Sequence, residues 1–327
     1  MRDSPCIRRR SIQPRRSRLR CCGVASNRNS RPAPPLTHTD PVAFGRATDC
    51  SLPVLDIAAV DEQRLVHLLD AGRPVRVRLA VHNTFSPGSV AAANVIGEIP
   101  GTPHPERVVV LGAHLDSWDL GVGAVDDGFG VAAALGAADA IVRSGLRPKS
   151  TIRVVLFSGK EQGLLGSRAW INAHRAGLPN VVAALVMDWG GVAITGVALS
   201  GHDEVATDLK TIAGAMDPFT QIRILDGYLT YTDAYSFTLA GLPGLAVIQD
   251  SPGYAAVGHS SADTLAEVDQ DVLVRDSAVF GMLVLGLAES STHNRYPWST
   301  GEISSRLEHD GQLEILRLLG LWPSGGR

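Results

Sequence analysis

The sequence predicts an α/β fold in which helices cover both faces of a mostly parallel central sheet. Continuous apolar segments of strand length, such as residues 107–113 (RVVVLGA), alternate with helical segments rich in small residues, such as residues 130–145. Strands that are apolar throughout are typical of parallel sheets, because both faces of such a sheet are buried. Apolar residues make up 45% of the 327 positions, which is enough for a sizeable core.

Each element is predicted from its own stretch of sequence. Residues 60–72 (VDEQRLVHLLDAG) have the pattern of a helix that ends at a glycine, and residues 74–81 (PVRVRLAV) alternate as a strand does. From residue 93 onward (ANVIGEIPG) strands and helices alternate. The expected strands lie at residues 107–113, 151–157, 181–187, 192–199 and 244–248, and the expected helices at residues 130–145, 167–177 and 264–288.

Charge is unevenly distributed along the chain. Residues 1–32 contain ten arginines and one acidic residue, whereas the remainder contains 20 basic and 32 acidic residues, a net charge of −12. Such an acidic body is not expected to bind nucleic acid. Residues 1–45 have no periodic apolar face, so we expect a disordered Arg-rich segment. An incorrect choice of start site, or a difference of reading frame, is the alternative explanation for it.

Targeting signals are not recognisable in the sequence. No apolar segment of adequate length follows the arginines, so a secretory signal is not supported. No uninterrupted run of about 20 apolar residues occurs, so no membrane span is expected. The location of the protein in the cell therefore stays open.

Histidine and acidic side chains follow the predicted strands where each strand ends. In open α/β sheets, functional groups gather beyond these ends. Taken singly, the residues have plainer explanations, since a His–Asp pair can be a surface pair and one aspartate at a helix start is an ordinary N-cap. Two adjacent acids in a glycine-rich loop exceed what an N-cap needs. The residues concerned are His114 with Asp116, Asp126 with Asp127, Lys160 with Glu161, Asp188, and His259.

Together these side chains indicate a metal site. Two histidines and three carboxylates from separate strand exits suit a pair of divalent ions with nitrogen and oxygen ligands. Imidazole ligands favour zinc-like metals over magnesium. All four cysteines lie within the first 50 residues, so a metal bound by the rest of the chain must use histidine and carboxylate ligands.

The sequence from about residue 50 to residue 290 resembles one known family, and five motifs carry the resemblance. They read VVVLGAHLDSWDLGVGAVDDGFG, LRPKSTIRVVLFSGKEQGLLGS, VMDWGG, TDAYSFTLAGLPG and GHSSADT. In content and order they are similar to the co-catalytic zinc peptidases of metallopeptidase family 28, especially the carboxypeptidase Q-like branch. The resemblance implies a zinc-dependent exopeptidase-like fold, two Zn²⁺ or similar divalent ions, and a small peptide as substrate. A homodimer is compatible with it, whereas no membrane partner is expected.

The resemblance also implies a role for each site residue. One ion would be bound by His114 and Asp188, the other by Glu161 and His259, with Asp126 as a bridge between them. Asp116 would orient His114. Asp233 and Tyr254 would contact the substrate.

The same resemblance predicts the domain organisation. Residues 46–92 would be a remnant of a protease-associated domain with a linker, and residues 93–292 the dizinc peptidase-like catalytic domain. Residues 293–327 would form a C-terminal tail with a short helix. Most of the protease-associated domain and the first strands of the catalytic domain are not recognisable, so we expect a chain truncated on the N-terminal side.

Two positions depart from the family pattern. Lys160 stands where the family has the glutamate that acts as general base, and Ala234 stands where many relatives have histidine. We therefore expect a metal-dependent exopeptidase-type hydrolase whose activity is impaired. The alternative is a catalytically silent metal-binding or interaction protein of the same fold. Acyl transfer, as in glutaminyl cyclases, would need the same missing base.

Overall fold

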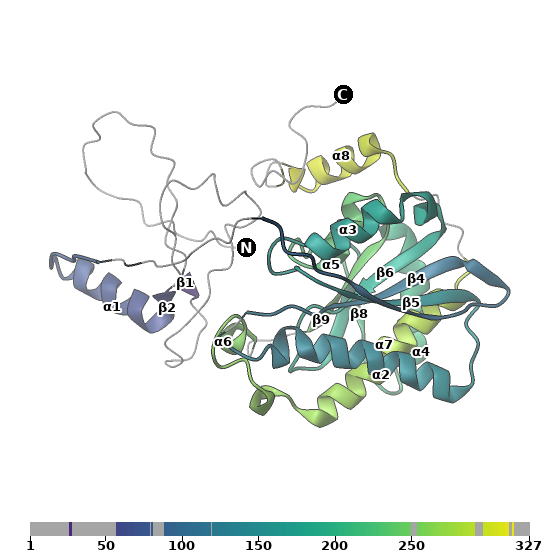
Figure 1. Cartoon of the computed structure of the whole chain (residues 1–327), viewed down its shortest axis with the longest axis horizontal. Helices are drawn as coiled ribbons and strands as arrows, with labels where there is room; N and C mark the ends of the chain where they lie inside the picture. The colour runs from purple at the N-terminus through teal and green to yellow at the C-terminus, as the bar shows by residue number, and fades with distance from the viewer. Residues whose placement is uncertain are drawn as a thin grey trace.

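The computed structural model describes residues 26–27, 57–78, 80, 88–118, 120–249, 254–291, 297–313 and 316. Apart from the two-residue strand β1 (Ser26–Asn27), the Arg-rich segment 1–45 lies outside the described residues, and so does the prediction that it is disordered. The main body is a sheet with helices on both faces, coloured teal to yellow in Figure 1. This confirms the predicted fold class.

The sheet has seven strands in the spatial order β3-β5-β4-β6-β9-β7-β8. The four neighbours β5, β4, β6 and β9 run parallel, whereas β3 is antiparallel to β5 and β7 is antiparallel to β9. The carboxyl ends of the four parallel strands therefore share one edge. The strands are β3 (Val95–Ile99), β4 (His104–His114), β5 (Ser150–Phe157), β6 (Val181–Val186), β7 (Ile194–Ala198), β8 (Arg223–Leu225) and β9 (Gly244–Gln249).

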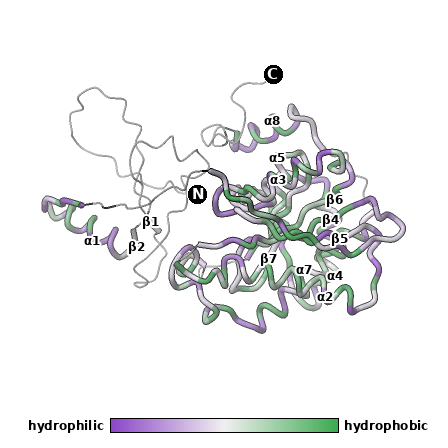
Figure 2. Tube along the Cα trace, in the orientation of Figure 1, coloured by the Kyte–Doolittle hydropathy of each residue, from purple (hydrophilic) through white to green (hydrophobic). Residues whose placement is uncertain are grey.

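The core lies on both faces of this sheet. Strand β4 is buried from Val108 to His114, as its apolar run predicts. Its side chains alternate, because Val109 and Leu111 belong to one core cluster whereas Val108 and Val110 belong to another. In Figure 2 the central strands are accordingly the most hydrophobic part of the trace.

Helices cover the two faces in separate groups. One face carries α2 (Phe129–Ser144), α4 (Ala206–Met216) and α7 (Gln270–Glu289), and the other carries α3 (Leu165–Ala173), α5 (Asp233–Leu239) and α8 (Thr300–His309). The helix α8 lies in the predicted C-terminal tail. Its Ile303 and Leu307 are buried in a cluster with Leu164 and Tyr235, so this segment packs against the body.

Several elements differ from the sequence-based prediction. The last long helix begins at Gln270 instead of residue 264, because Asp269 caps it by accepting hydrogen bonds from the backbone N–H groups of Asp271 and Val272. The prediction of a strand at 74–81 was wrong for its described part, since residues 74–78 and residue 80 form no strand.

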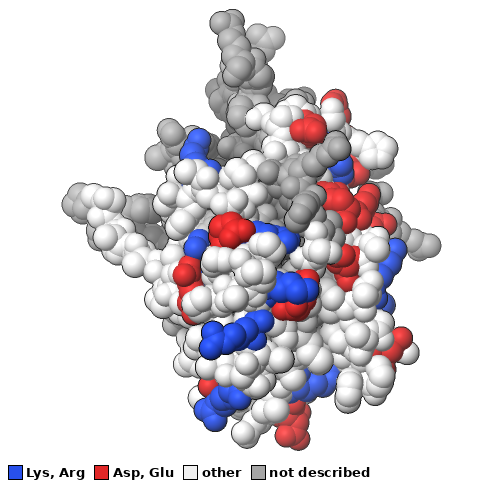
Figure 3. Space-filling view, turned by 90° about the vertical axis from the view of Figure 1, so that its right-hand side faces the viewer, with Lys and Arg blue, Asp and Glu red and all other residues white. Residues whose placement is uncertain are grey.

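Helix α1 (Ala59–Asp70) confirms the helix predicted at 60–72. It lies beside the strand pair formed by β1 and β2 (Ile57–Ala58) and away from the seven-stranded sheet in Figure 1. None of the helices in the described part of the chain combines the length and the apolarity that a bilayer crossing requires. Lysine, arginine and acidic side chains are interspersed on the face shown in Figure 3.

Candidate metal centre

The residues singled out from the sequence meet at the carboxyl edge of the parallel strands. His114 is the last residue of β4, Lys160 and Glu161 follow β5 after a short turn, and Asp188 follows β6 by two residues. Gly159, at φ 72°, adopts the left-handed conformation that the turn after β5 requires and that glycine adopts without strain. These side chains, which follow different strands in the sequence, therefore lie close together, as their positions at the strand exits predict.

His114, Asp126 and Asp188 form one group of side chains that could hold a metal ion. The Nε2 atom of His114 lies 3.0 Å from Asp126 Oδ1 and 3.5 Å from Asp188 Oδ1. All three residues are buried. One nitrogen and two carboxylate oxygens facing one point are a ligand set that zinc accepts.

Asp126, Glu161 and His259 form a second such group, so Asp126 belongs to both. The Nε2 atom of His259 lies 3.1 Å from Asp126 Oδ2 and 3.3 Å from Glu161 Oε1. The two oxygens of Asp126 therefore face different groups, the geometry that a bridging carboxylate needs. His259 has a φ of 54°, a conformation that is uncommon outside glycine and that often occurs at functional sites.

The arrangement fits a pair of metal ions because its polar atoms are buried without hydrogen-bond partners. Buried polar groups are normally hydrogen-bonded, so a cluster of exceptions requires an explanation such as an absent ion. At this centre the buried atoms that make no hydrogen bond are His114 Nε2, Asp126 Oδ1, Glu161 Oε1, Asp188 Oδ2 and His259 Nε2. Each of the five predicted ligands contributes one of them.

Asp116 contacts both His114 and the loop after β5. The Nδ1 atom of His114 lies 2.8 Å from the backbone oxygen of Asp116, and since a carbonyl only accepts, the Nδ1–H donates and leaves Nε2 for a metal. The Asp116 carboxylate lies farther from Nδ1, at 3.7 Å. It accepts hydrogen bonds from the backbone N–H groups of Lys160 and Glu161. Asp116 is thus placed to orient His114 and to fix Glu161.

Lys160 points into the centre. Its Nζ atom lies 2.8 Å from Asp188 Oδ1, 3.4 Å from Glu161 Oε2 and 3.9 Å from Asp126 Oδ1, and the residue is only 8% exposed. Burial lowers the pKa of Lys160, but the carboxylates of Asp126 and Asp188 raise it well above its ordinary value. The side chain is therefore an ammonium ion surrounded by the predicted metal ligands.

The histidines are also held as cations while no metal is bound. Burial lowers the pKa of His259, but its contacts with Asp126 and Glu161 raise it to about 10. Burial and the Lys160 ammonium lower the pKa of His114, yet the surrounding carboxylates outweigh both, and its pKa lies well above the ordinary value. Metal binding would have to release these protons.

Two further aspartates hold the loop that carries Asp126. The Asp127 carboxylate accepts hydrogen bonds from the backbone N–H groups of His114 and Gly130. The Asp263 carboxylate accepts hydrogen bonds from the backbone N–H groups of Val125 and Asp126. Sequence reasoning did not assign a role to Asp263. The only signal was its place in the GHSSADT motif, four residues after His259.

We expect Asp263→Ala to weaken metal binding about 10- to 100-fold, the usual effect of removing a group that orients a ligand. The change leaves the N–H groups of Val125 and Asp126 without their acceptor, so the bridging carboxylate is no longer fixed. Zinc titration followed by calorimetry measures the affinity. Asp139→Ala on the exposed face of α2 is the matched control, and an equal affinity in the two variants would contradict the positioning role.

The two predicted substrate contacts lie at different depths. The Tyr254 hydroxyl donates a hydrogen bond to Asp126 Oδ2 at 2.6 Å, so this residue contacts the centre directly. Asp233, at the start of α5, is fully buried, and burial raises its pKa to about 7. Ala234 beside it is buried as well. Both substrate contacts stay predictions.

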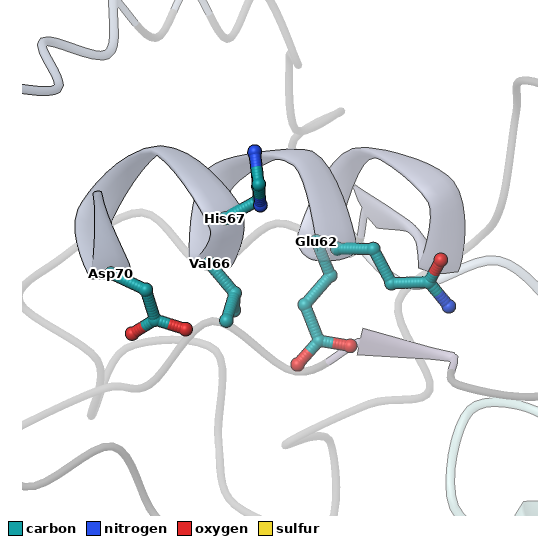
Figure 4. A pocket seen from close by; sticks show the side chains of 5 residues that line it. Glu62, Val66, His67 and Asp70 are labelled. Carbon is teal, nitrogen blue, oxygen red and sulfur yellow. The ribbon is translucent and has the colours of Figure 1, made fainter. Parts of the chain in front are cut away.

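A small hollow next to the centre is lined by Trp118, Asp126, His259, Ser260 and Asp263. His259 is the most exposed of the predicted ligands, with 16% of its side chain accessible. A larger hollow lies along α1 and is shown in Figure 4. All five side chains that line it belong to that one helix, so it is separate from the metal centre.

Comparison with known proteins identifies the family. The model of the family described as Peptidase family M28 matches residues 94–284, more than half of the chain. The chain belongs to Peptidase family M28. This confirms the resemblance that the sequence motifs indicate, and with it the terms hydrolase and metallopeptidase for the family.

Several relatives in family M28 are carboxypeptidases by name. Carboxypeptidase Q of Xenopus laevis is 31% identical over 218 residues, which cover 67% of this chain and 46% of that protein. Carboxypeptidase Q of Bos taurus is 30% identical over 241 residues, 73% of this chain and 50% of that protein. The chain thus spans about half the length of these relatives.

Solved structures of family M28 have the same fold. A peptidase M28 precursor from Shewanella amazonensis superposes with a TM-score of 0.64 at 26% identity, over 76% of this chain and 56% of that chain. An aminopeptidase from Aneurinibacillus sp. superposes with a TM-score of 0.52 at 21% identity, over 75% of this chain and 60% of that chain. The second likeness supports the fold alone.

Proposed function

We propose that the protein is a zinc-dependent exopeptidase-type hydrolase that acts on small peptides through a dinuclear site and has weak activity in its native form. The observation that carries the proposal is the pair of ligand groups that share Asp126. Membership of Peptidase family M28 and the carboxypeptidase Q relatives support the reaction class.

Each ion would have its own ligands in this chain. His114 and Asp188 would hold one, Glu161 and His259 the other, and Asp126 would bridge them. Two such ions, when bound, polarise a carbonyl and make water nucleophilic at neutral pH. The chain itself would fix the ligands through Asp116, Asp127 and Asp263 and would orient Asp126 through the Tyr254 hydroxyl.

Proton transfer is the step that Lys160 weakens. Peptide hydrolysis needs a group that takes a proton from the attacking water and gives one to the leaving amine. An ammonium ion has no lone pair with which to accept a proton, and Lys160 is held in that form by its carboxylate neighbours. The Nζ atom of Lys160 faces Asp188 and is buried. It is therefore not placed to bind a substrate as an exposed lysine could.

A catalytically silent metal-binding protein of the same fold is the second candidate. The same lysine favours it, since the centre has all five predicted ligands and a lysine at the predicted position of the base. The two candidates make the same prediction for metal content and differ in turnover. A panel of dipeptides and N-blocked dipeptides, assayed with zinc-loaded protein, separates them, and it also distinguishes amino-terminal from carboxy-terminal cleavage.

We expect gently purified protein to bind about two zinc-like ions per chain at saturating metal, the number that a pair of three-ligand groups sharing one carboxylate accommodates. Elemental analysis after dialysis against zinc, cobalt or manganese measures the stoichiometry. The matched variant is His259→Ala, which should lose mainly one ion. A native protein that takes up none of the three metals would exclude the proposed function.

A further inference from the structure

We propose that the Lys160 ammonium is a tethered cation that competes with one of the two metal ions. The ion of the His114 group would then bind more weakly than the ion of the His259 group. The inference rests on the proposed function to the extent that metal ions bind at this centre. It adds an order of binding and assigns that order to one residue of this chain.

The position of the ammonium places it in competition with a metal ion. Lys160 Nζ lies among all three carboxylates of the centre, with Asp188 at 2.8 Å, Glu161 at 3.4 Å and Asp126 at 3.9 Å. The ammonium therefore already supplies part of the positive charge that the ligands attract.

The ammonium contacts different oxygen atoms in the two ligand groups. Asp188 Oδ1 and Asp126 Oδ1 face both Lys160 Nζ and His114 Nε2. In the other group, His259 Nε2 faces Asp126 Oδ2 and Glu161 Oε1, whereas Lys160 Nζ faces the opposite oxygens of these two carboxylates. The lysine thus contacts the carboxylate oxygens that face His114 Nε2 and does not contact those that face His259 Nε2.

Electrostatic repulsion between the ammonium and an entering metal ion is strong at this centre. Lys160, Asp126 and Asp188 are all buried, so their charges are poorly screened by solvent. An ion that enters the His114 group must either sit beside the ammonium, which repels it, or displace the ammonium from Asp188. An ion in the His259 group would use carboxylate oxygens that the ammonium does not contact.

The ammonium also has a role while no metal is bound. Three carboxylates converge here, and without a cation between them their mutual repulsion would destabilise the fold. The Lys160 ammonium, which contacts all three carboxylates, offsets that repulsion. Removing the lysine charge should therefore destabilise the metal-free protein and at the same time favour its loading with metal.

The experiment compares native protein with Lys160→Met, which keeps an unbranched side chain one atom shorter and removes the charge. Lys210→Met, on the exposed face of α4, is the matched control. Zinc titration by calorimetry should give native protein one tight and one weaker site. In Lys160→Met the weaker site should tighten by about tenfold or more, a change typical of groups next to metal ligands.

A second pair of variants assigns the sites. In the native background, His259→Ala should remove the tight ion, whereas His114→Ala should remove the weak one. The melting temperature gives an independent measurement. In the presence of a chelator Lys160→Met should melt below native protein, and saturating zinc should stabilise the variant more than it stabilises native protein.

The outcomes separate this inference from the proposed function. Two ions bound with equal affinity by native protein, and unchanged affinities in Lys160→Met, would overturn the inference and leave the dinuclear hydrolase standing. Loss of the weak ion in His259→Ala instead of His114→Ala would overturn the assignment of the sites. No metal bound by either native protein or Lys160→Met would overturn both the inference and the proposed function.

Discussion

Replacement of Lys160 with glutamate is expected to raise kcat/KM for dipeptide hydrolysis by about a hundredfold or more, because general acid–base catalysis contributes roughly 10²–10⁴-fold. A carboxylate at this position can accept a proton from the attacking water and return one to the leaving amine. The native ammonium can do neither, and its 2.8 Å contact with Asp188 holds it in the charged form. The substitution therefore adds a base at the position where the family pattern has one.

The comparison requires equal metal content in both proteins, since Lys160→Glu also removes a positive charge from the centre. Lys160→Gln is the matched control, because it removes the same charge and supplies no base. We expect Lys160→Gln to stay near the native rate while Lys160→Glu exceeds both. Fast hydrolysis by native protein that slows in Lys160→Glu would show that the role assigned to this position is wrong.

The location of the centre could be predicted from the sequence for a simple physical reason. Strands β4, β5 and β6 are apolar runs that end abruptly at polar residues, and parallel strands bring their carboxyl ends to one edge. His114, Glu161 and Asp188 are therefore neighbours in space although they lie far apart in the chain. For these strands, the hydrophobic pattern and the parallel topology both predict that the three side chains lie together.

The short and antiparallel elements could not be predicted in the same way. Strand β8 has three residues, too few for a periodic pattern, and β7 runs antiparallel to β9, a direction that its apolar sequence does not encode. The start of α7 was predicted at residue 264, too early in the chain, because the hydrophobic pattern does not show that Asp269 caps the helix. Strands β7 and β8 lie beyond the four parallel strands, and none of the predicted metal ligands lies on either of them or on α7.

Atomic contacts within the centre also lay beyond sequence reasoning. The motif places Lys160 after β5, but only the structure shows its Nζ atom turned to Asp188 and not toward solvent. The Asp263 carboxylate accepts a hydrogen bond from the backbone N–H group of Asp126, which lies 137 residues earlier in the chain. No local sequence pattern extends across such a separation. Such contacts depend on how distant loops pack, and they decide which oxygen of each carboxylate remains for a metal.

Asp126→Ala is expected to abolish the binding of both ions, whereas substitution of any other predicted ligand should affect mainly one. The reason is the division of its two oxygens, since Oδ1 faces His114 Nε2 at 3.0 Å and Oδ2 faces His259 Nε2 at 3.1 Å. Without this side chain each group retains only two of its three protein ligands. Elemental analysis after zinc dialysis measures the loss, and activity should fall to background with it.

The controls for this experiment address folding and specificity. Asp126 is buried and accepts a hydrogen bond from Tyr254, so a melting curve with a chelator present must first show that Asp126→Ala folds. Asp188→Ala should lose mainly the ion of the His114 group, and His259→Ala mainly the other, so that the bridging residue alone removes both. If Asp126→Ala folds and still holds two ions, Asp126 is not the bridge, and the centre would have to be two independent sites whose ions share no ligand.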